Sequence, residues 1–261
     1  MEPDKVEAPG EGNRQAWKTG QCRKISRVLP RGRYRNRKYL HSIRLALAVL
    51  VNACAGPAPA AQSVEAPPAE VAPDAVAESL LVDVRAVDGT IRVEARYATA
   101  DNFTGAPLPG YEAQRVLLRR EPAAALGRVQ ARLRREGLGL KVFDGYRPVR
   151  ATLAMVDWTE RTARGDLVAD GYIARRSRHN LGVAVDLTLV ELATGEELPM
   201  GTAFDTFTAE AHTASAEGPV RSHRRRLVRT MEAEGFVNYE KEWWHFSYPV
   251  EGALPFDLVI R

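Results

Sequence analysis

The segment Ser177–Leu189, SRHNLGVAVDLTL, decides the fold class of this 261-residue chain. Val183, Val185 and Leu187 alternate with smaller or polar residues, and this period of two predicts a strand. The alternation places Asp186 on the strand face opposite these apolar side chains. A carboxylate in such a strand is costly to bury unless it pairs with a charge or binds a cation. Three roles therefore remain open for Asp186: the cap of a local turn, the partner of an arginine, or a metal ligand.

Helices and short strands surround this segment without a regular β-α-β alternation. Apolar periodicity predicts helices over residues 111–120, 121–136, 149–164 and 220–234, and strands over 80–87, 91–97, 138–143, 183–189, 236–239 and 243–248. The first two strands flank Asp88-Gly89, which favours a hairpin turn. We therefore expect one α+β domain over residues 80–261, a central and mostly antiparallel sheet flanked by helices.

The net charge of +4 is unevenly distributed along the chain. Residues 1–44 carry 12 basic and 4 acidic side chains, whereas residues 80–261 carry 25 of each. A domain without net positive charge lacks the general attraction to phosphate on which nucleic-acid binders depend, so we expect no nucleic-acid partner. The two cysteines, Cys22 and Cys54, both precede the domain. A metal ion in the domain would therefore need His, Asp or Glu ligands.

Residues 1–54 resemble a basic region followed by an export signal. The apolar run is about 10 residues long, where a membrane-spanning helix needs ~20. Val51–Cys54 resembles a bacterial lipobox that would make Cys54 a lipid anchor, the one membrane attachment we expect, and cleavage after an Ala-x-Ala sequence is the alternative. Both predict an exported protein of the periplasm or cell envelope. Residues 55–79, rich in Ala and Pro, are predicted to be an extended linker.

Residues 239–248, YEKEWWHFSY, carry the second group of candidate residues. A zinc hydrolase needs three protein ligands, an open position for water, and a nearby carboxylate that accepts the proton of that water. His179, Asp186 and His245 would supply the ligands. Glu242 would supply the proton acceptor. Because strict alternation would separate Glu242 from His245, we expect Glu242 at the entry of the strand, where a bend aims it inward.

The third candidate segment is residues 143–149, FDGYRPV. It places Arg147 between a predicted strand and a helix whose first turn Pro148 opens. A surface ion pair is the alternative role for Arg147.

Together, these segments resemble the D-alanyl-D-alanine dipeptidases, the VanX-type branch of the zinc DD-peptidase superfamily. The matching motifs lie in the order of the family and cover most of residues 80–250. They are RYATADNFTG (96–105), DGYRP (144–148), His179-x6-Asp186 with Ser177 before it, PMGTAFD (199–205) and EWWH (242–245).

The resemblance implies hydrolysis of D-Ala-D-Ala, or a related small peptide, to D-alanine in cell-wall peptide turnover or glycopeptide resistance. It implies one Zn²⁺ per chain, bound on the sheet, and a role for each matched residue. The zinc ligands are His179, Asp186 and His245, the general base is Glu242, the oxyanion is stabilised by Arg147, and the substrate ammonium and dipeptide are positioned by Asp205, Ser177 and Tyr97. The alternatives are a DD- or LD-carboxypeptidase acting on peptidoglycan stem peptides and a non-hydrolytic, zinc-containing wall-binding domain.

Overall fold

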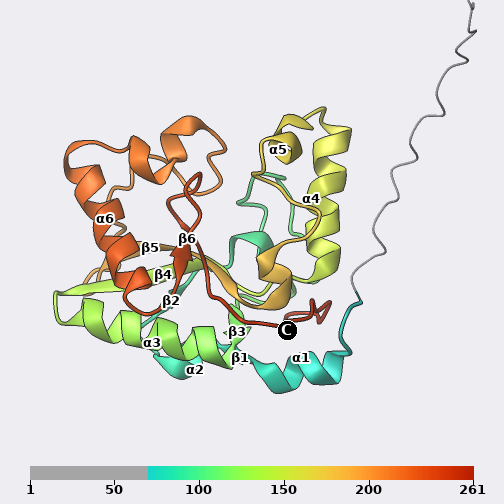
Figure 1. Cartoon of the computed structure of the whole chain (residues 1–261), viewed down its shortest axis with the longest axis horizontal. Helices are drawn as coiled ribbons and strands as arrows, with labels where there is room; N and C mark the ends of the chain where they lie inside the picture. The colour runs from blue at the N-terminus through green and yellow to red at the C-terminus, as the bar shows by residue number, and fades with distance from the viewer. Residues whose placement is uncertain (1–69) are drawn as a thin grey trace, which may run out of the picture. The chain divides into compact units, whose positions relative to one another are not determined.

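A computed structural model describes residues 70–261 of the chain. A five-stranded sheet lies at the centre of this part, in the order β2-β4-β5-β7-β6 (Figure 1). Its strands are β2 (Arg92–Val93), β4 (Leu138–Asp144), β5 (Ala184–Glu191), β6 (Val237–Asn238) and β7 (His245–Ser247). The β2–β4 pair is parallel and the other pairs are antiparallel. The α+β class with a mostly antiparallel sheet is thereby confirmed.

One face of the sheet packs against two long helices, α3 (Arg120–Arg134) and α6 (Gly218–Glu232). The two-residue alternation along β5 explains why this face is apolar, because it directs Val185, Leu187 and Leu189 into the same core. The opposite face of β5 presents Asp186 and Thr188, which are also buried. The strand thus separates an apolar layer from a layer that contains polar side chains.

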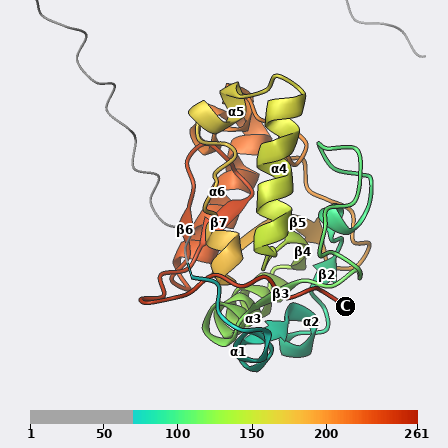
Figure 2. The ribbon, with the colours of Figure 1, turned by 90° about the vertical axis from the view of Figure 1, so that its right-hand side faces the viewer.

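The remaining helices and a second, smaller sheet lie around this core. The helices are α1 (Asp74–Leu80), α2 (Val84–Val87), α4 (Val149–Arg161) and α5 (Asp166–Ala169). The second sheet joins β1 (Leu81–Asp83) to β3 (Leu117–Arg119) in antiparallel orientation. Figure 2 shows α4 standing along one side of the domain, above β3 and α3.

The predicted hairpin around Asp88-Gly89 is wrong. The side chain of Asp83 accepts a hydrogen bond from the Arg85 backbone N–H at 2.9 Å and caps α2, so residues 84–87 are helical. The side chain of Asp88 binds the backbone and hydroxyl of Thr90 and forms a local turn. This turn leads into β2, which pairs with β4 instead of with the preceding residues.

The predicted helix over residues 111–120 is also wrong, because part of this segment is β3. Leu117 and Leu118 are both buried, yet they enter two different apolar clusters. Consecutive residues point to opposite sides in a strand, so long-range packing on both sides selects the extended conformation over the helix.

The two ends of the described segment lie together. Ala72 forms a bridge to Phe256, Tyr111 forms a bridge to Ile260, and both Phe256 and Ile260 are buried. The C-terminus accordingly lies near β3 in both views (Figures 1 and 2). Residues 72–79, assigned to the linker from the sequence, thus lie on the domain.

The predicted signal falls outside the described residues, within which no helix has the length and apolar character to cross a membrane.

Candidate active site

Three side chains with metal-ligand chemistry converge at the ends of adjacent elements. Asp186 lies on β5 directly opposite His245 on β7. His179 lies in the short 3-10 helix Arg178–Leu181, just before β5. Gly182, in the left-handed conformation with φ 68°, ends this helix. In the part of the chain that the structure describes, this is the one group of three such residues whose ligand atoms all lie within 4.8 Å of one another.

The distances among these atoms fit one small cation. His179 Nε2 lies 3.1 Å from His245 Nδ1 and 3.4 Å from Asp186 Oδ2, and His245 Nδ1 lies 2.9 Å from Asp186 Oδ1. Ligands bound to Zn²⁺ at ~2.0–2.1 Å in a tetrahedron are about 3.3 Å apart. His179 Nδ1 donates to the carbonyl oxygen of Gly145 at 2.7 Å, which leaves Nε2 as the metal-binding nitrogen. The residues present therefore fit a zinc ion.

Glu242 lies beside this group, in the turn that precedes β7. Its Oε2 is 3.9 Å from His245 Nδ1, and its side chain is buried. The backbone N–H of His245 donates to the carbonyl oxygen of Glu242, so the chain bends before the strand begins. The sequence predicted such a bend at the entry of the strand. It places the Glu242 side chain on the same side of the chain as the His245 imidazole, three residues further on.

Arg147 reaches the same cavity from the turn between β4 and α4. Its Nε and Nη2 donate to Asp144 Oδ2 at 3.0 and 2.8 Å, and Nη2 lies 3.8 Å from Asp186 Oδ2. A register shift between Val142 and Asp144 places Asp144 opposite Asp186, on the site's face of the sheet. The alternative of a surface ion pair is wrong, because Arg147 is only 9% exposed.

Asp205 and Tyr97 form a second polar pair in the cavity. The Tyr97 hydroxyl lies 3.0 and 3.1 Å from the two carboxylate oxygens of Asp205. Asp205 adopts a left-handed backbone conformation with φ 59°, which is uncommon for a residue with a side chain. Ser177 also lines the cavity, and its Oγ accepts a hydrogen bond from the His179 backbone N–H. Ser177 therefore also orients a metal-ligand candidate.

Burial and like charges shift the ionisation of the acids. Burial, together with the charge of Asp186, raises the pKa of Glu242 and of Asp205 well above their usual values. Burial would also raise the pKa of Asp186, but the imidazoles of His179 and His245 outweigh it and lower that pKa. A cation at the site would oppose the upward shifts. The three acids thus differ in the direction of their pKa shifts, which is downward for Asp186 and upward for Glu242 and Asp205.

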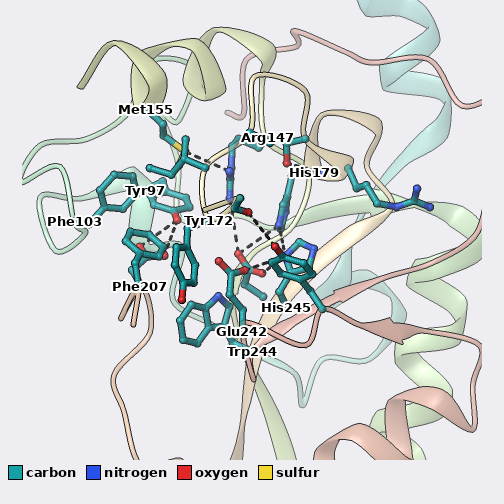
Figure 3. Close-up of a pocket in the computed structure, with 18 of the residues that line it drawn as sticks. Tyr97, Phe103, Arg147, Met155, Tyr172, His179, Phe207, Glu242, Trp244 and His245 are labelled. Carbon is teal, nitrogen blue, oxygen red and sulfur yellow. Dashed lines mark hydrogen bonds and ion pairs between the residues drawn. The ribbon is translucent and has the colours of Figure 1, made fainter. Parts of the chain in front are cut away.

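The cavity has a volume of about 270 Å³ and brings together all eight residues predicted from the sequence. Figure 3 shows Arg147, His179, His245 and Glu242 around its centre, with aromatic side chains on another side. Sequence analysis missed the aromatic lining residues Phe103, Tyr172 and Phe207. It also missed Asp144 as the partner of Arg147, although its position three residues before Arg147 was a usable signal.

Comparisons with known proteins found a matching family model and several relatives. The model of the peptidase M15 family, described as D-Ala-D-Ala dipeptidase, matches residues 77–257. A D-alanyl-D-alanine dipeptidase of Enterococcus faecium is 39% identical over 172 residues, which span 60% of this chain and 85% of that protein. One from Escherichia coli is 33% identical over 177 residues, which span 67% of this chain and 88% of that protein.

Two solved structures show weaker similarity. The LD-carboxypeptidase LdcB is 25% identical with a TM-score of 0.36, over 52% of this chain and 61% of that chain. The D,D-dipeptidase VanXYg, in complex with a phosphinate analogue of D-Ala-D-Ala, is 17% identical with a TM-score of 0.34, over 66% of this chain and 68% of that chain.

Proposed function

Because the chain belongs to the peptidase M15 family of D-Ala-D-Ala dipeptidases, we propose that it hydrolyses D-Ala-D-Ala to D-alanine in cell-wall peptide turnover or glycopeptide resistance. The observation that carries the proposal is the convergence of three metal-ligand candidates, a buried glutamate and a buried arginine on one cavity. At about 270 Å³ the cavity is slightly smaller than the ~300–1,000 Å³ of most small-ligand pockets. A dipeptide suits that size better than a polymer does.

We propose that His179, Asp186 and His245 hold one Zn²⁺ per chain. Their donor types and mutual distances support the assignment. When bound, zinc supplies Lewis-acid activation of water and polarisation of the scissile carbonyl.

Glu242 is proposed to carry the proton through the reaction. Its carboxylate takes a proton from the attacking water while the water oxygen bonds to the carbonyl carbon. It then delivers this proton to the nitrogen of the leaving D-alanine as the C–N bond breaks. The position of Glu242 supports this role, because its side chain is buried and its Oε2 lies 3.9 Å from Nδ1 of the proposed zinc ligand His245.

Arg147 is proposed to stabilise the negative charge that develops on the carbonyl oxygen. Asp144 fixes the guanidinium through two hydrogen bonds, and the Tyr111 hydroxyl donates to the other oxygen of Asp144 at 2.6 Å. Such preorganisation means that the guanidinium need not reorient as the charge forms.

Asp205 is proposed to bind the free ammonium group of the dipeptide. Its carboxyl is buried beside Tyr97, and an arriving ammonium group favours the ionised form through a charge-assisted hydrogen bond. An N-acylated peptide carries no such charge, so it would leave Asp205 without this partner.

The test is to purify the chain, measure its zinc content, and follow release of D-alanine from D-Ala-D-Ala, its L,L isomer and N-acylated D-Ala-D-Ala. Turnover of the free D,D-dipeptide alone is the expected result. Preference for the acylated substrate would instead indicate a carboxypeptidase. Stoichiometric zinc without turnover of any of these substrates would indicate a binding domain.

We further propose that the protein is exported, to the periplasm or cell envelope. The basic region and short apolar run of residues 1–54 support export, with Cys54 as the lipidated residue or with cleavage nearby. Cell fractionation of the wild type and Cys54→Ala would test both parts. If Cys54→Ala loses membrane association and the wild type keeps it, Cys54 is lipidated. Recovery of the wild type in the cytosol would contradict export.

A further inference from the structure

Arg224 of α6 ties together the two ends of the loop that carries Asp205. Its Nε donates to the carbonyl oxygen of Met200 at 2.8 Å, just before the loop. Its Nη1 donates to the carbonyl oxygens of His212 at 2.7 Å and Glu210 at 3.1 Å, after the loop. One guanidinium therefore fixes both ends of a segment with Asp205 near its middle.

The chemistry of this contact is unusual for a buried cation. Arg224 is 2% exposed, and no carboxylate among residues 70–261 forms an ion pair with it. All its hydrogen-bond partners are backbone carbonyl oxygens, and its guanidinium lies 6.0 Å from the centre of the Trp243 ring. Because a buried, unpaired charge is costly, these neutral acceptors must compensate for the lost water. Only arginine has enough donors in a planar fork to serve three separate carbonyl groups.

The loop needs such support because of the conformation of Asp205. Its φ of 59° lies in the left-handed region, which is uncommon for residues with a Cβ and stores strain that contacts of the surrounding structure offset. Trp243 assists, since its Nε1 donates to Thr202 Oγ1 at 2.8 Å and its backbone N–H donates to the Ala211 carbonyl oxygen at 3.1 Å. Trp243 directly follows Glu242, so the same contacts link the loop to the turn that carries the proposed base.

We infer that Arg224 is a positioning residue for substrate recognition: it holds the loop between Met200 and Glu210 so that Asp205 can meet the ammonium group of the dipeptide. Arg224 does not line the cavity, and it acts on the substrate only through Asp205. The inference rests on the proposed role of Asp205 as the ammonium receptor.

The first experiment compares Arg224→Met and Arg224→Lys with the control Arg225→Met, whose side chain is exposed on the same helix. Both Arg224 variants should raise KM for D-Ala-D-Ala about tenfold, with kcat changed by less than about threefold and zinc content unchanged. Lysine should not restore KM, because one ammonium group cannot reach all three carbonyls. The control should behave like the wild type.

A double substitution separates positioning from a general structural effect. In an Asp205→Asn background, Arg224→Met should raise KM no further, because the residue through which Arg224 acts has already lost its charge. Hydrogen exchange should also accelerate at backbone amides of residues 201–212, while those of β4 and β5 stay protected. An unchanged KM, or an equal increase of KM with and without the Asp205 carboxylate, would overturn the inference.

Folding failure and failure of the proposed function give different results. If the Arg224 variants do not fold, Thr202→Val takes their place, because it removes the hydrogen bond from Trp243 at the start of the loop. This variant should also raise KM for D-Ala-D-Ala. An unchanged KM in Thr202→Val would overturn the inference. If the wild type releases no D-alanine, the proposed function fails and the substrate role of Arg224 fails with it. Wild-type turnover with normal KM in the Arg224 variants refutes the Arg224 inference alone.

Discussion

Replacing Arg147 by alanine should damage stability and catalysis by separate and separable mechanisms. The substitution removes a guanidinium that gives two hydrogen bonds to Asp144, a carboxylate that is 1% exposed. Asp144 keeps the hydroxyl of Tyr111 at 2.6 Å and the imidazole of His179 at 3.3 Å. In the variant, the Asp144 carboxylate is therefore a buried charge without a cationic arginine partner, and only these two contacts stabilise it.

The cost in stability follows from this loss of a partner. Breaking a buried ion pair on one side costs about 3–5 kcal/mol, and the two remaining contacts of Asp144 place this case near the lower limit. For domains of this size each kcal/mol lowers Tm by roughly 2–4 °C. We expect Arg147→Ala to lower Tm by about 6–12 °C and, through the lost oxyanion contact, to lower kcat about 10²–10³-fold.

The double variant Arg147→Ala/Asp144→Asn distinguishes the two effects. It removes the unpaired charge, so Tm should recover most of its loss while kcat stays low. Thermal unfolding, zinc content and D-alanine release at saturating substrate measure the three quantities. If the single variant binds zinc and retains more than about a tenth of wild-type kcat, Arg147 does not stabilise the oxyanion. If the double variant is no more stable than the single one, the unpaired Asp144 is not the cause of the lower Tm.

Four further outcomes are expected. Glu242→Gln should keep zinc and lower kcat about 10²–10⁴-fold, and near-normal turnover would exclude Glu242 as the base. Asp205→Asn should reduce the preference for free over N-acylated dipeptide in kcat/KM, so an unchanged ratio would contradict ammonium recognition at Asp205. Chelation should abolish turnover and lower Tm, both reversibly with zinc, because only the folded chain brings the three ligands together; an unaffected Tm would count against the site. Hydrogen bonding to Arg128 lowers the pKa of Glu234 below 4.5, so its stabilising contribution is present above that pH and is lost as pH falls through the folded-state pKa. Glu234→Gln should accordingly lower stability at neutral pH by less than about 1 kcal/mol and have no effect in strong acid, and an equal loss at both pH values would refute the linkage.

The elements that sequence analysis located correctly are those whose pattern is local and long. The helices α3, α4 and α6 each show an apolar periodicity sustained over several turns, and β4 and β5 are buried runs that end in recognisable turns. Residues 84–87 and 117–119 are too short for such a pattern. Their structures depend on the Asp83 cap and on pairing between β1 and β3, two contacts that periodicity does not reveal.

The part of the site that could be predicted consists of residues whose chemical type and motif indicate a role. His179, Asp186, Glu242 and His245 stand in motifs whose spacing matches a known family, and the cavity brings them together. Other contributors carry no such signal. Phe207 contacts Phe103 and Tyr172 only through the three-dimensional fold, and an arginine among the basic residues of α6 gives no sign in the sequence that it is buried.

The C-terminal segment has a consequence for the order in which the protein matures. The Phe256 backbone N–H donates to the Asn180 carbonyl oxygen, and the Phe256 carbonyl oxygen accepts from the Val149 N–H, so the tail touches the immediate neighbourhood of His179 and Arg147. Phe256 and Ile260 are buried, yet the ribosome adds them after every residue of the site. A nascent chain still lacking them has an open core beneath the site. Activity therefore has to wait until this segment has been synthesised.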